Sequence, residues 1–176
     1  NPYTPKSKAA ISIFFQNFME SISSAGCCLF TSYVVLPGPI VGKPNSKIAK
    51  VVNVGFIAVG PVIALMVKHP AIASMNLPLI MYPYALKYAT GMKMNIGKML
   101  KIGERGYNIE RQCNIILGQQ AGADTLPKRL TSELQVAGDA RTKVPLDKML
   151  KSYYSIRGWK NGVPKASKLK KLGINK

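Results

Sequence analysis

Hydrophobic side chains recur along the chain at three- and four-residue steps, which is the spacing of amphipathic helices. The first such stretch runs from Ser7 to Ser21, with apolar positions at Ala10, Ile11, Phe14, Phe15, Phe18 and Met19. The longest predicted helix runs from Ile96 to Leu117, with Asn95 as its cap. Its apolar side is formed by Met99, Leu100, Tyr107, Cys113, Ile116 and Leu117. Both stripes predict helices that pack on a common core.

Three glycines interrupt the longest predicted helix, at Gly97, Gly103 and Gly106. Glycine in a helix interior costs about 1 kcal/mol relative to alanine. We therefore expect these positions to allow close packing of another backbone.

Proline and glycine positions predict several shorter elements. A short helix starts near Pro83 and ends at Gly91, two more start at Pro127 and Pro145, and a last one runs from Pro164 to Leu172. Residues 37–44 predict a loop, and Asn45-Ser46 predicts the cap of the next helix. No stretch shows the sustained alternation of a strand. The sequence predicts an all-α, irregular multi-helix domain with long loops over residues 1–176.

The segment from Val51 to Val67 is an apolar run without a charged residue. It falls short of the roughly 20 residues that cross a bilayer, and Gly60 and Pro61 lie within it. We expect a buried helix pair broken at the proline rather than a membrane span. The apolar segments between Val51 and Met81 also exceed what a chain of this length hides easily, which predicts an interface.

The charge is strongly unbalanced, with 25 Lys and Arg against 7 Asp and Glu among 176 residues and a formal net charge of +18. Such an excess is typical of proteins that bind nucleic acid or anionic lipid. A small basic nucleic-acid-binding protein is therefore one alternative, although no nucleic-acid-binding motif supports it. The only lysine cluster is near the C-terminus, at Lys165, Lys168, Lys170 and Lys171. We expect these side chains to be solvated.

A constellation of residues in the second half of the chain points to a known family. It lies in residues 90–129 and 146–159, at Gly103, Glu104, Arg105, Asn108, Glu110, Arg111, Asn114, Asp124, Leu126, Pro127, Arg129, Tyr153, Tyr154, Arg157, Gly158 and Trp159. This spacing resembles the C-terminal region of the tungsten-dependent aldehyde:ferredoxin oxidoreductase family. The resemblance covers most of the chain and implies a C-terminal helical domain of a larger multidomain enzyme, whose upstream domains lie outside this sequence.

The resemblance also assigns a cofactor site to the segment after the first helix. In the family, a turn in this place supplies the fourth cysteine of a [4Fe–4S] cluster and contacts one of two pterins that hold tungsten. Here Cys28 takes the metal-ligand position, and Ser23 stands where the family carries Asp. Gly26 and Cys27 complete the cofactor-binding turn, and the glycine lets the backbone approach a cofactor and frees N–H groups to point at it. Three cysteines cannot complete a four-cysteine site, so the other ligands must come from elsewhere.

The remaining polar residues have structural interpretations. Cys113 is expected to be a small buried side chain, and His69 to be solvated or structural. Glu104 and Arg111 predict an internal network of hydrogen bonds and ion pairs. Tyr153, Tyr154, Arg157 and Trp159 predict a packed corner with an arginine against an aromatic face. No catalytic residue is assigned.

The function that the resemblance implies belongs to the whole enzyme. Such an enzyme oxidises aldehydes to carboxylic acids with tungsten (or molybdenum) bis-pterin and a [4Fe–4S] cluster, and passes electrons to ferredoxin or an electron-transfer subunit. A family variant that reduces an aromatic acyl-CoA is an alternative. The implied partners are the remaining domains and, in some assemblies, a second copy in a homodimer; we expect no nucleic acid. The cysteine usage favours a cytoplasmic location.

Overall fold

The computed structural model describes residues 3–30, 42–43, 46–76, 80–120 and 122–174. The α-helices are α1 (Lys8–Ser24), α3 (Lys47–Lys68), α4 (Tyr82–Thr90), α5 (Ile96–Ile116), α6 (Lys128–Ser132), α7 (Leu146–Arg157) and α8 (Ala166–Lys171). Two 3-10 turns, η2 (Pro70–Ile72) and η3 (Ala140–Thr142), and the strands β1 (Trp159–Lys160) and β2 (Val163–Pro164) complete the described elements. The expected all-α class is confirmed. The predicted loop over residues 37–44 lies mostly outside the described residues.

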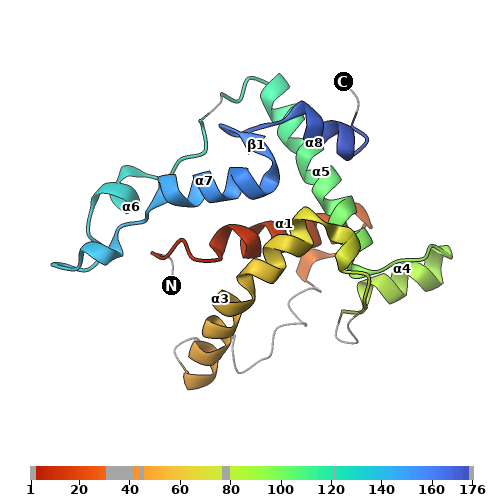
Figure 1. Ribbon diagram of the computed structural model, residues 1–176, viewed down its shortest axis with the longest axis horizontal. Coiled ribbons are helices and arrows are strands. Elements are labelled where there is room, and N and C mark those ends of the chain that lie inside the picture. The colour runs from red at the N-terminus through yellow and green to blue at the C-terminus, as the bar shows by residue number, and fades with distance from the viewer. Residues whose placement is uncertain (1–2, 31–41, 44–45, 77–79, 121, 175–176) are drawn as a thin grey trace.

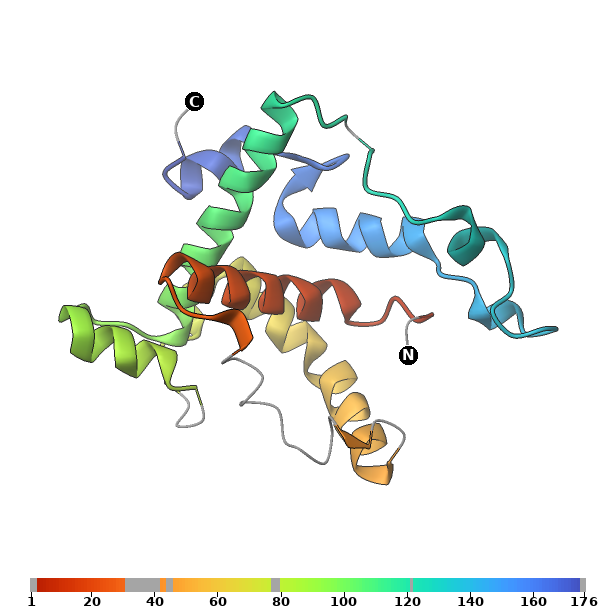
Figure 2. The ribbon, with the colours of Figure 1, turned by 180° about the vertical axis from the view of Figure 1, so that it is seen from behind.

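The core lies where α1 crosses the first half of α5 (Figures 1 and 2). Its buried side chains are Phe18, Ile22, Ala73, Met94, Ile96, Met99 and Leu100. Helix α7 lies beside α1, and α8 lies beside α5 (Figure 1). The apolar stripe of the first predicted helix is thus the face that holds the domain together.

Several helix ends lie where capping chemistry predicts them. The side chain of Asn95 accepts a hydrogen bond from the Lys98 amide at 2.8 Å, and Ser46 caps α3 in the same way. Helix α4 ends at Gly91, which adopts the left-handed conformation that favours glycine. The longest helix is α3, however, which exceeds α5 by one residue.

The close backbone approach predicted for the α5 glycines is confirmed at Gly97 and Gly103. A methyl group at Gly103 would overlap the backbone oxygen of Asn17 in α1, and one at Gly97 would overlap that of Pro70. At Gly106 the obstacle is the side chain of Glu20. Gly103 therefore sets how closely α1 packs on α5, and Gly97 sets how closely η2 approaches α5.

Replacing Gly103 with alanine in the full-length protein should loosen the α1–α5 crossing. Overpacking against a backbone costs about 3 kcal/mol, whereas alanine returns about 1 kcal/mol of helix propensity. A net loss of about 2 kcal/mol predicts amide hydrogen exchange about 30-fold faster in α1 and α5. Gly106→Ala is the matched control, because the Glu20 side chain can move aside. Equal exchange in both variants would contradict this explanation.

The second half of α5 differs from the prediction. Ile116 and Leu117 are 80% and 84% exposed, and Cys113 is exposed rather than buried. This end of α5 extends past α1 and α8 (Figure 1). The expectation of a buried Cys113 is therefore wrong for the described chain, since an apolar stripe is buried only where another element meets it.

Helix α3 also differs from the prediction of a buried, broken helix pair. It is one unbroken helix with Pro61 inside it, and only 6% of its most apolar 18-residue stretch is buried. Proline cannot donate to the carbonyl four residues earlier, which is that of Ile57. The Ser7 hydroxyl donates to this carbonyl at 2.9 Å instead. The lost hydrogen bond is thereby replaced from α1's N-terminal side, and the helix continues through the proline.

A hairpin replaces the start of the last predicted helix. Strands β1 and β2 pair antiparallel, with Trp159 opposite Pro164. Between them Asn161 and Gly162 have φ of 49° and 79°, as a two-residue hairpin loop requires. The last helix consequently begins at Ala166 rather than Pro164.

Candidate functional site

The cysteine turn follows directly from the way α1 ends. Gly26 has φ of 72°, its amide donates to the Ser23 carbonyl at 2.9 Å, and the Cys27 amide donates to the Ile22 carbonyl at 3.1 Å. These two bonds form a Schellman motif, in which glycine allows the chain to reverse out of the helix. The sequence therefore makes a fixed C-terminus for α1, and Cys28 follows it immediately.

This geometry corrects the expected role of the backbone at the turn. Ser23 and Ser24 are helical rather than part of the turn. The glycine was expected to free nearby N–H groups for a cofactor, but the amides of Gly26 and Cys27 are both bonded to carbonyls of α1. Gly26 is needed for its left-handed conformation, which a side chain would strain.

All four candidate cofactor residues lie at the surface of the described chain. Ser23, Gly26, Cys27 and Cys28 are exposed, and a Cβ at Gly26 would meet no atom within 4 Å. The Cys27 thiol donates to the Ala25 carbonyl at 3.9 Å. The turn therefore presents its sulfur-bearing side outward, where a large group outside this chain can approach.

The described residues contain no group of three or more His, Cys, Asp or Glu side chains that could hold a metal ion. Cys113 lies on α5 about 15 Å beyond the Gly103 crossing, at a rise of about 1.5 Å per residue. An iron–sulfur cluster at Cys28 would therefore need ligands from outside the described residues. The turn fits as a contributor of one thiolate.

The helix behind the turn is held firmly in place. Asn17 and Ser21 contact Gly103 through their backbones, and the Glu20 side chain lies against Gly106. The Ser24 hydroxyl donates to the Glu20 carboxylate at 3.3 Å. Burial, together with the charge of Glu110, raises the pKa of Glu20. The last turn of α1 is thereby fixed by α5, which limits the motion of the cysteines.

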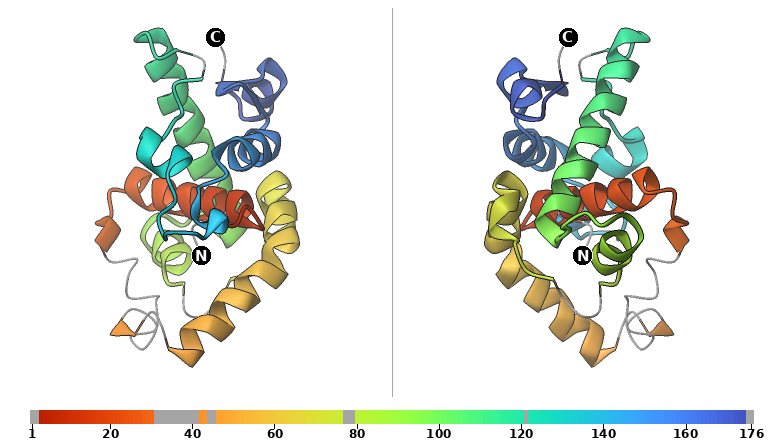
Figure 3. Two further views of the ribbon diagram at one scale, coloured as in Figure 1. Left: turned by 90° about the vertical axis from the view of Figure 1, so that its left-hand side faces the viewer. Right: turned by 90° about the vertical axis from the view of Figure 1, so that its right-hand side faces the viewer.

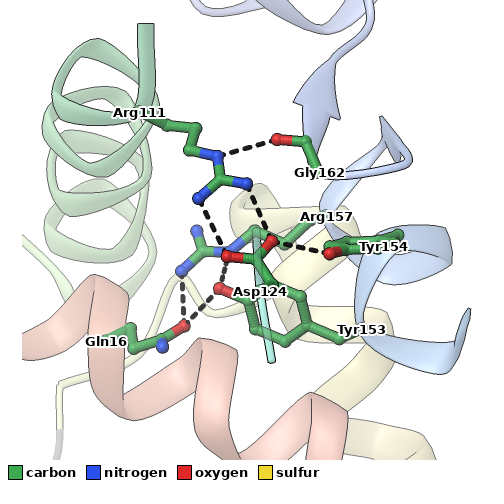
Figure 4. A network of polar contacts seen from close by, with 7 residues as sticks. All are labelled: Gln16, Arg111, Asp124, Tyr153, Tyr154, Arg157 and Gly162. Carbon is green, nitrogen blue, oxygen red and sulfur yellow. Dashed lines mark hydrogen bonds and ion pairs between the residues drawn. The ribbon is translucent and has the colours of Figure 1, made fainter. Parts of the chain in front are cut away.

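The second half of the chain builds a polar network around Arg111 (Figure 4). Its guanidinium binds both carboxylate oxygens of Asp124, at 3.0 and 2.7 Å, and its Nε donates to the Gly162 carbonyl at 2.7 Å. The Tyr154 hydroxyl donates to Asp124 at 2.6 Å. This network joins α5, the Asp124 loop, α7 and the hairpin. The Asn-Gly pair at the hairpin tip was the sequence signal for the Gly162 contact, and our prediction did not use it.

Arg157, which is fully buried, is the centre of a second part of the network (Figure 4). It donates to Asn17 Oδ1 at 2.6 Å, to Gln16 Oε1 at 2.8 Å and to the Tyr153 hydroxyl at 3.1 Å. Its guanidinium carbon lies 4.1 Å from the centroid of the Tyr107 ring. The predicted packed corner is confirmed, and it fastens α7 to α1.

A cavity of about 300 Å³ opens beside this network. Its lining residues are Gln16, Tyr107, Glu110, Arg111, Asn114, Asp124, Leu150, Tyr153 and Trp159. The donors of Arg111 are engaged by Asp124 and Gly162. Burial raises the pKa of Tyr107, and burial together with the Asp124 hydrogen bond raises that of Tyr154 to about 12. Both phenols therefore stay protonated at neutral pH, which suits structural donors rather than catalytic bases.

Glu104 forms a buried ion pair, as predicted, but with Lys168, a partner that the sequence did not indicate. Its side chain is 4% exposed and meets Lys168, which is 11% exposed. Glu104 Oε1 accepts no well-aligned hydrogen bond within the described chain, so Lys168 is its charge partner. The expectation that Lys168 is solvated is wrong, whereas Lys165, Lys170 and Lys171 are exposed. His69 is exposed as expected.

Replacing Lys168 with glutamine should destabilise the α5–α8 contact. Removing one partner of a buried ion pair leaves an uncompensated charge and costs about 3 to 5 kcal/mol. We expect hydrogen exchange in α8 of the full-length enzyme to increase at least about 100-fold. Lys170→Gln on the exposed face of α8 is the matched control and should change exchange little. Indistinguishable variants would show that the pair does not hold α8.

Comparison with known proteins identifies the family. The model of the family described as aldehyde ferredoxin oxidoreductase, domains 2 and 3, matches residues 1–174. The chain belongs to this family. Proteins named tungsten-containing aldehyde ferredoxin oxidoreductase are similar over 96 residues: those of Pyrococcus abyssi and Pyrococcus furiosus are 41% identical, and that of Thermococcus kodakarensis is 38% identical. No solved structure matches the chain significantly.

The matched stretch is 53% of this chain and 16% of each relative. The chain therefore matches only a small part of the length of its relatives, and further domains of the same enzyme are implied. The aromatic corner and the Arg111 network lie inside the family match. Arg157 of the corner binds Gln16 and Asn17 of α1, the helix whose C-terminus carries the cysteine turn.

Proposed function

We propose that this chain is the C-terminal, cofactor-supporting part of a tungsten (or molybdenum) pterin and iron–sulfur oxidoreductase that oxidises aldehydes to carboxylic acids. The observation that supports the proposal is the exposed turn from Ser23 to Cys28, fixed by a Schellman motif at the end of a rigidly packed helix. This turn carries an exposed thiol, in a chain that belongs to the aldehyde ferredoxin oxidoreductase family.

The overall reaction converts an aldehyde and water into a carboxylic acid, two protons and two electrons. The bound metal–pterin and cluster supply the redox chemistry, with the electrons leaving one at a time. The names of the relatives contain ferredoxin, and two ferredoxins are the proposed acceptors here. An enzyme of the same family that reduces an aromatic acyl-CoA is the alternative.

In the proposed site, the residues of this chain would bind the cofactors and hold them in position. The Cys28 thiolate would ligate one iron of a [4Fe–4S] cluster. Ser23, in the last turn of α1, would offer a hydroxyl to the pterin as a neutral hydrogen-bonding group. Gly26 allows the left-handed backbone conformation of the turn. Cys27 lies between Gly26 and the proposed ligand Cys28 in the sequence. The packing of α1 on Gly103 holds these groups at one place.

The proposed partners follow from the same assignment. The other domains of the enzyme would supply the remaining cluster ligands, and ferredoxin or an electron-transfer subunit would accept the electrons. A homodimer is the proposed higher assembly.

The full-length enzyme, purified without oxygen, tests the proposal. We expect one tungsten or molybdenum and at least four irons per chain, and aldehyde-dependent reduction of ferredoxin. Reduction of an aromatic acyl-CoA without aldehyde oxidation would favour the alternative. Protein that is correctly folded after metal loading but holds neither metal would overturn the cofactor assignment.

A further inference from the structure

Helix α3 is apolar on too many sides for a helix at a protein surface. A surface helix usually has one apolar stripe about 100° wide. In α3 the exposed large apolar residues are Ile48, Val51, Val54, Phe56, Val59, Val62 and Leu65. At about 100° per residue, the first four alone cover about 200° of the circumference. A helix of this kind is stable when other groups surround it.

Only the C-terminal half of α3 is held by the described domain. The Ser7 side chain bonds to the Ile57 carbonyl and lies against Gly60, and Val67 is fully buried. The N-terminal half, residues 47–56, projects away from the other described helices (Figure 3). Val51 and Val54 in this half are 71% and 64% exposed.

A lipid bilayer does not fit this arrangement. By length and composition alone, α3 could cross a membrane. However, residues 47–56 are only about 15 Å long at 1.5 Å per residue, whereas the hydrocarbon core is about 30 Å thick. Further insertion would carry α1 and its polar contacts into lipid, because α1 is fastened to α3 from Ile57 onward.

We infer that the projecting half of α3 is enclosed by a segment of the same enzyme that lies outside these 176 residues. The relatives are far longer than the matched stretch, so such a segment is implied. Two copies of α3 packed on each other would cover one stripe each and leave the rest exposed. Gly55, whose Cβ position is empty, lets an enclosing backbone approach closely. The inference rests on the chain being part of a longer enzyme and is independent of the cluster assignment.

Thiol labelling in the full-length enzyme tests whether the helix is covered. Val51→Cys and Val54→Cys should react with a maleimide at least about tenfold more slowly than Lys170→Cys, an exposed position on α8, when labelling is read peptide by peptide. All three should react alike after denaturation. Equal labelling in the native enzyme would overturn the inference.

Photo-crosslinking identifies what covers it. A benzoylphenylalanine placed at Val54 should crosslink to a peptide outside residues 1–176 of the same chain. Crosslinks to a second subunit, to residues 1–176 or to lipid would each overturn the inference. If the bulky group prevents folding, the cysteine variants still decide whether the helix is covered, and a crosslinker attached at Val51→Cys replaces it. Neither readout depends on activity, so an inactive or cluster-free enzyme gives the same answer about α3.

Discussion

Replacing Cys28 with alanine in the full-length enzyme should remove the visible absorption of the four-iron cluster or convert it to a three-iron form. The reason is that a [4Fe–4S] cluster normally needs four thiolates, and the turn offers Cys28 at a fixed place behind the Schellman motif. Electron transfer from aldehyde to ferredoxin should fall by at least about 100-fold, as expected when a residue that binds the redox group is removed. Electron paramagnetic resonance of the reduced enzyme measures the cluster directly.

Two cysteines of the same chain serve as matched controls. Cys27→Ala and Cys113→Ala should leave a four-iron spectrum, and Cys113→Ala should cost little stability because that side chain is exposed. If Cys28→Ala retains the four-iron signal while Cys27→Ala loses it, the ligand is Cys27 and the register of the resemblance is off by one residue. An intact signal in all three variants would remove the cluster from this turn.

Replacing Arg157 with alanine should greatly destabilise the domain. The side chain is fully buried, and Asn17, Gln16 and Tyr153 all accept its hydrogen bonds. Its removal leaves a cavity and takes away the donor of the buried Asn17 Oδ1, for which we expect a cost of about 3 to 5 kcal/mol. Hydrogen exchange in α1 and α7 of the full-length enzyme should then be faster by a factor on the order of 100 or more.

Other arginine variants separate geometry from charge. Arg157→Lys keeps the charge but loses the planar fork that reaches several acceptors, so its exchange rates should also rise substantially. Arg141 pairs with Asp139 on the surface, and its side chain is 92% exposed. Arg141→Ala should leave exchange in α1 and α7 unchanged. A tolerated Arg157→Ala would mean that the aromatic corner does not fasten α7 to α1.

The sequence by itself determined the features that depend on neighbours along the chain. Asn95 and Ser46 cap helices because each side chain accepts a hydrogen bond from the backbone amide three residues later. Gly91 ends α4 because it adopts a left-handed conformation without strain. The glycines of α5 indicated a close approach without identifying α1 as the helix that approaches. The all-α class and the family followed from such local patterns and residue spacings.

The tertiary structure decided everything that depends on which elements meet. Pro61 was expected to break a helix, but the Ser7 hydroxyl donates a hydrogen bond to the Ile57 carbonyl, which the proline cannot reach with an N–H of its own. Lys168 looked like its solvated neighbours, yet its position on α8 places it against buried Glu104. Burial and ion pairing are properties of contacts between distant segments, whereas periodicity and capping are properties of one segment. For the same reason the sequence located the cysteine turn, but only the packed α1 showed that its amides are already bonded and that its thiols face outward.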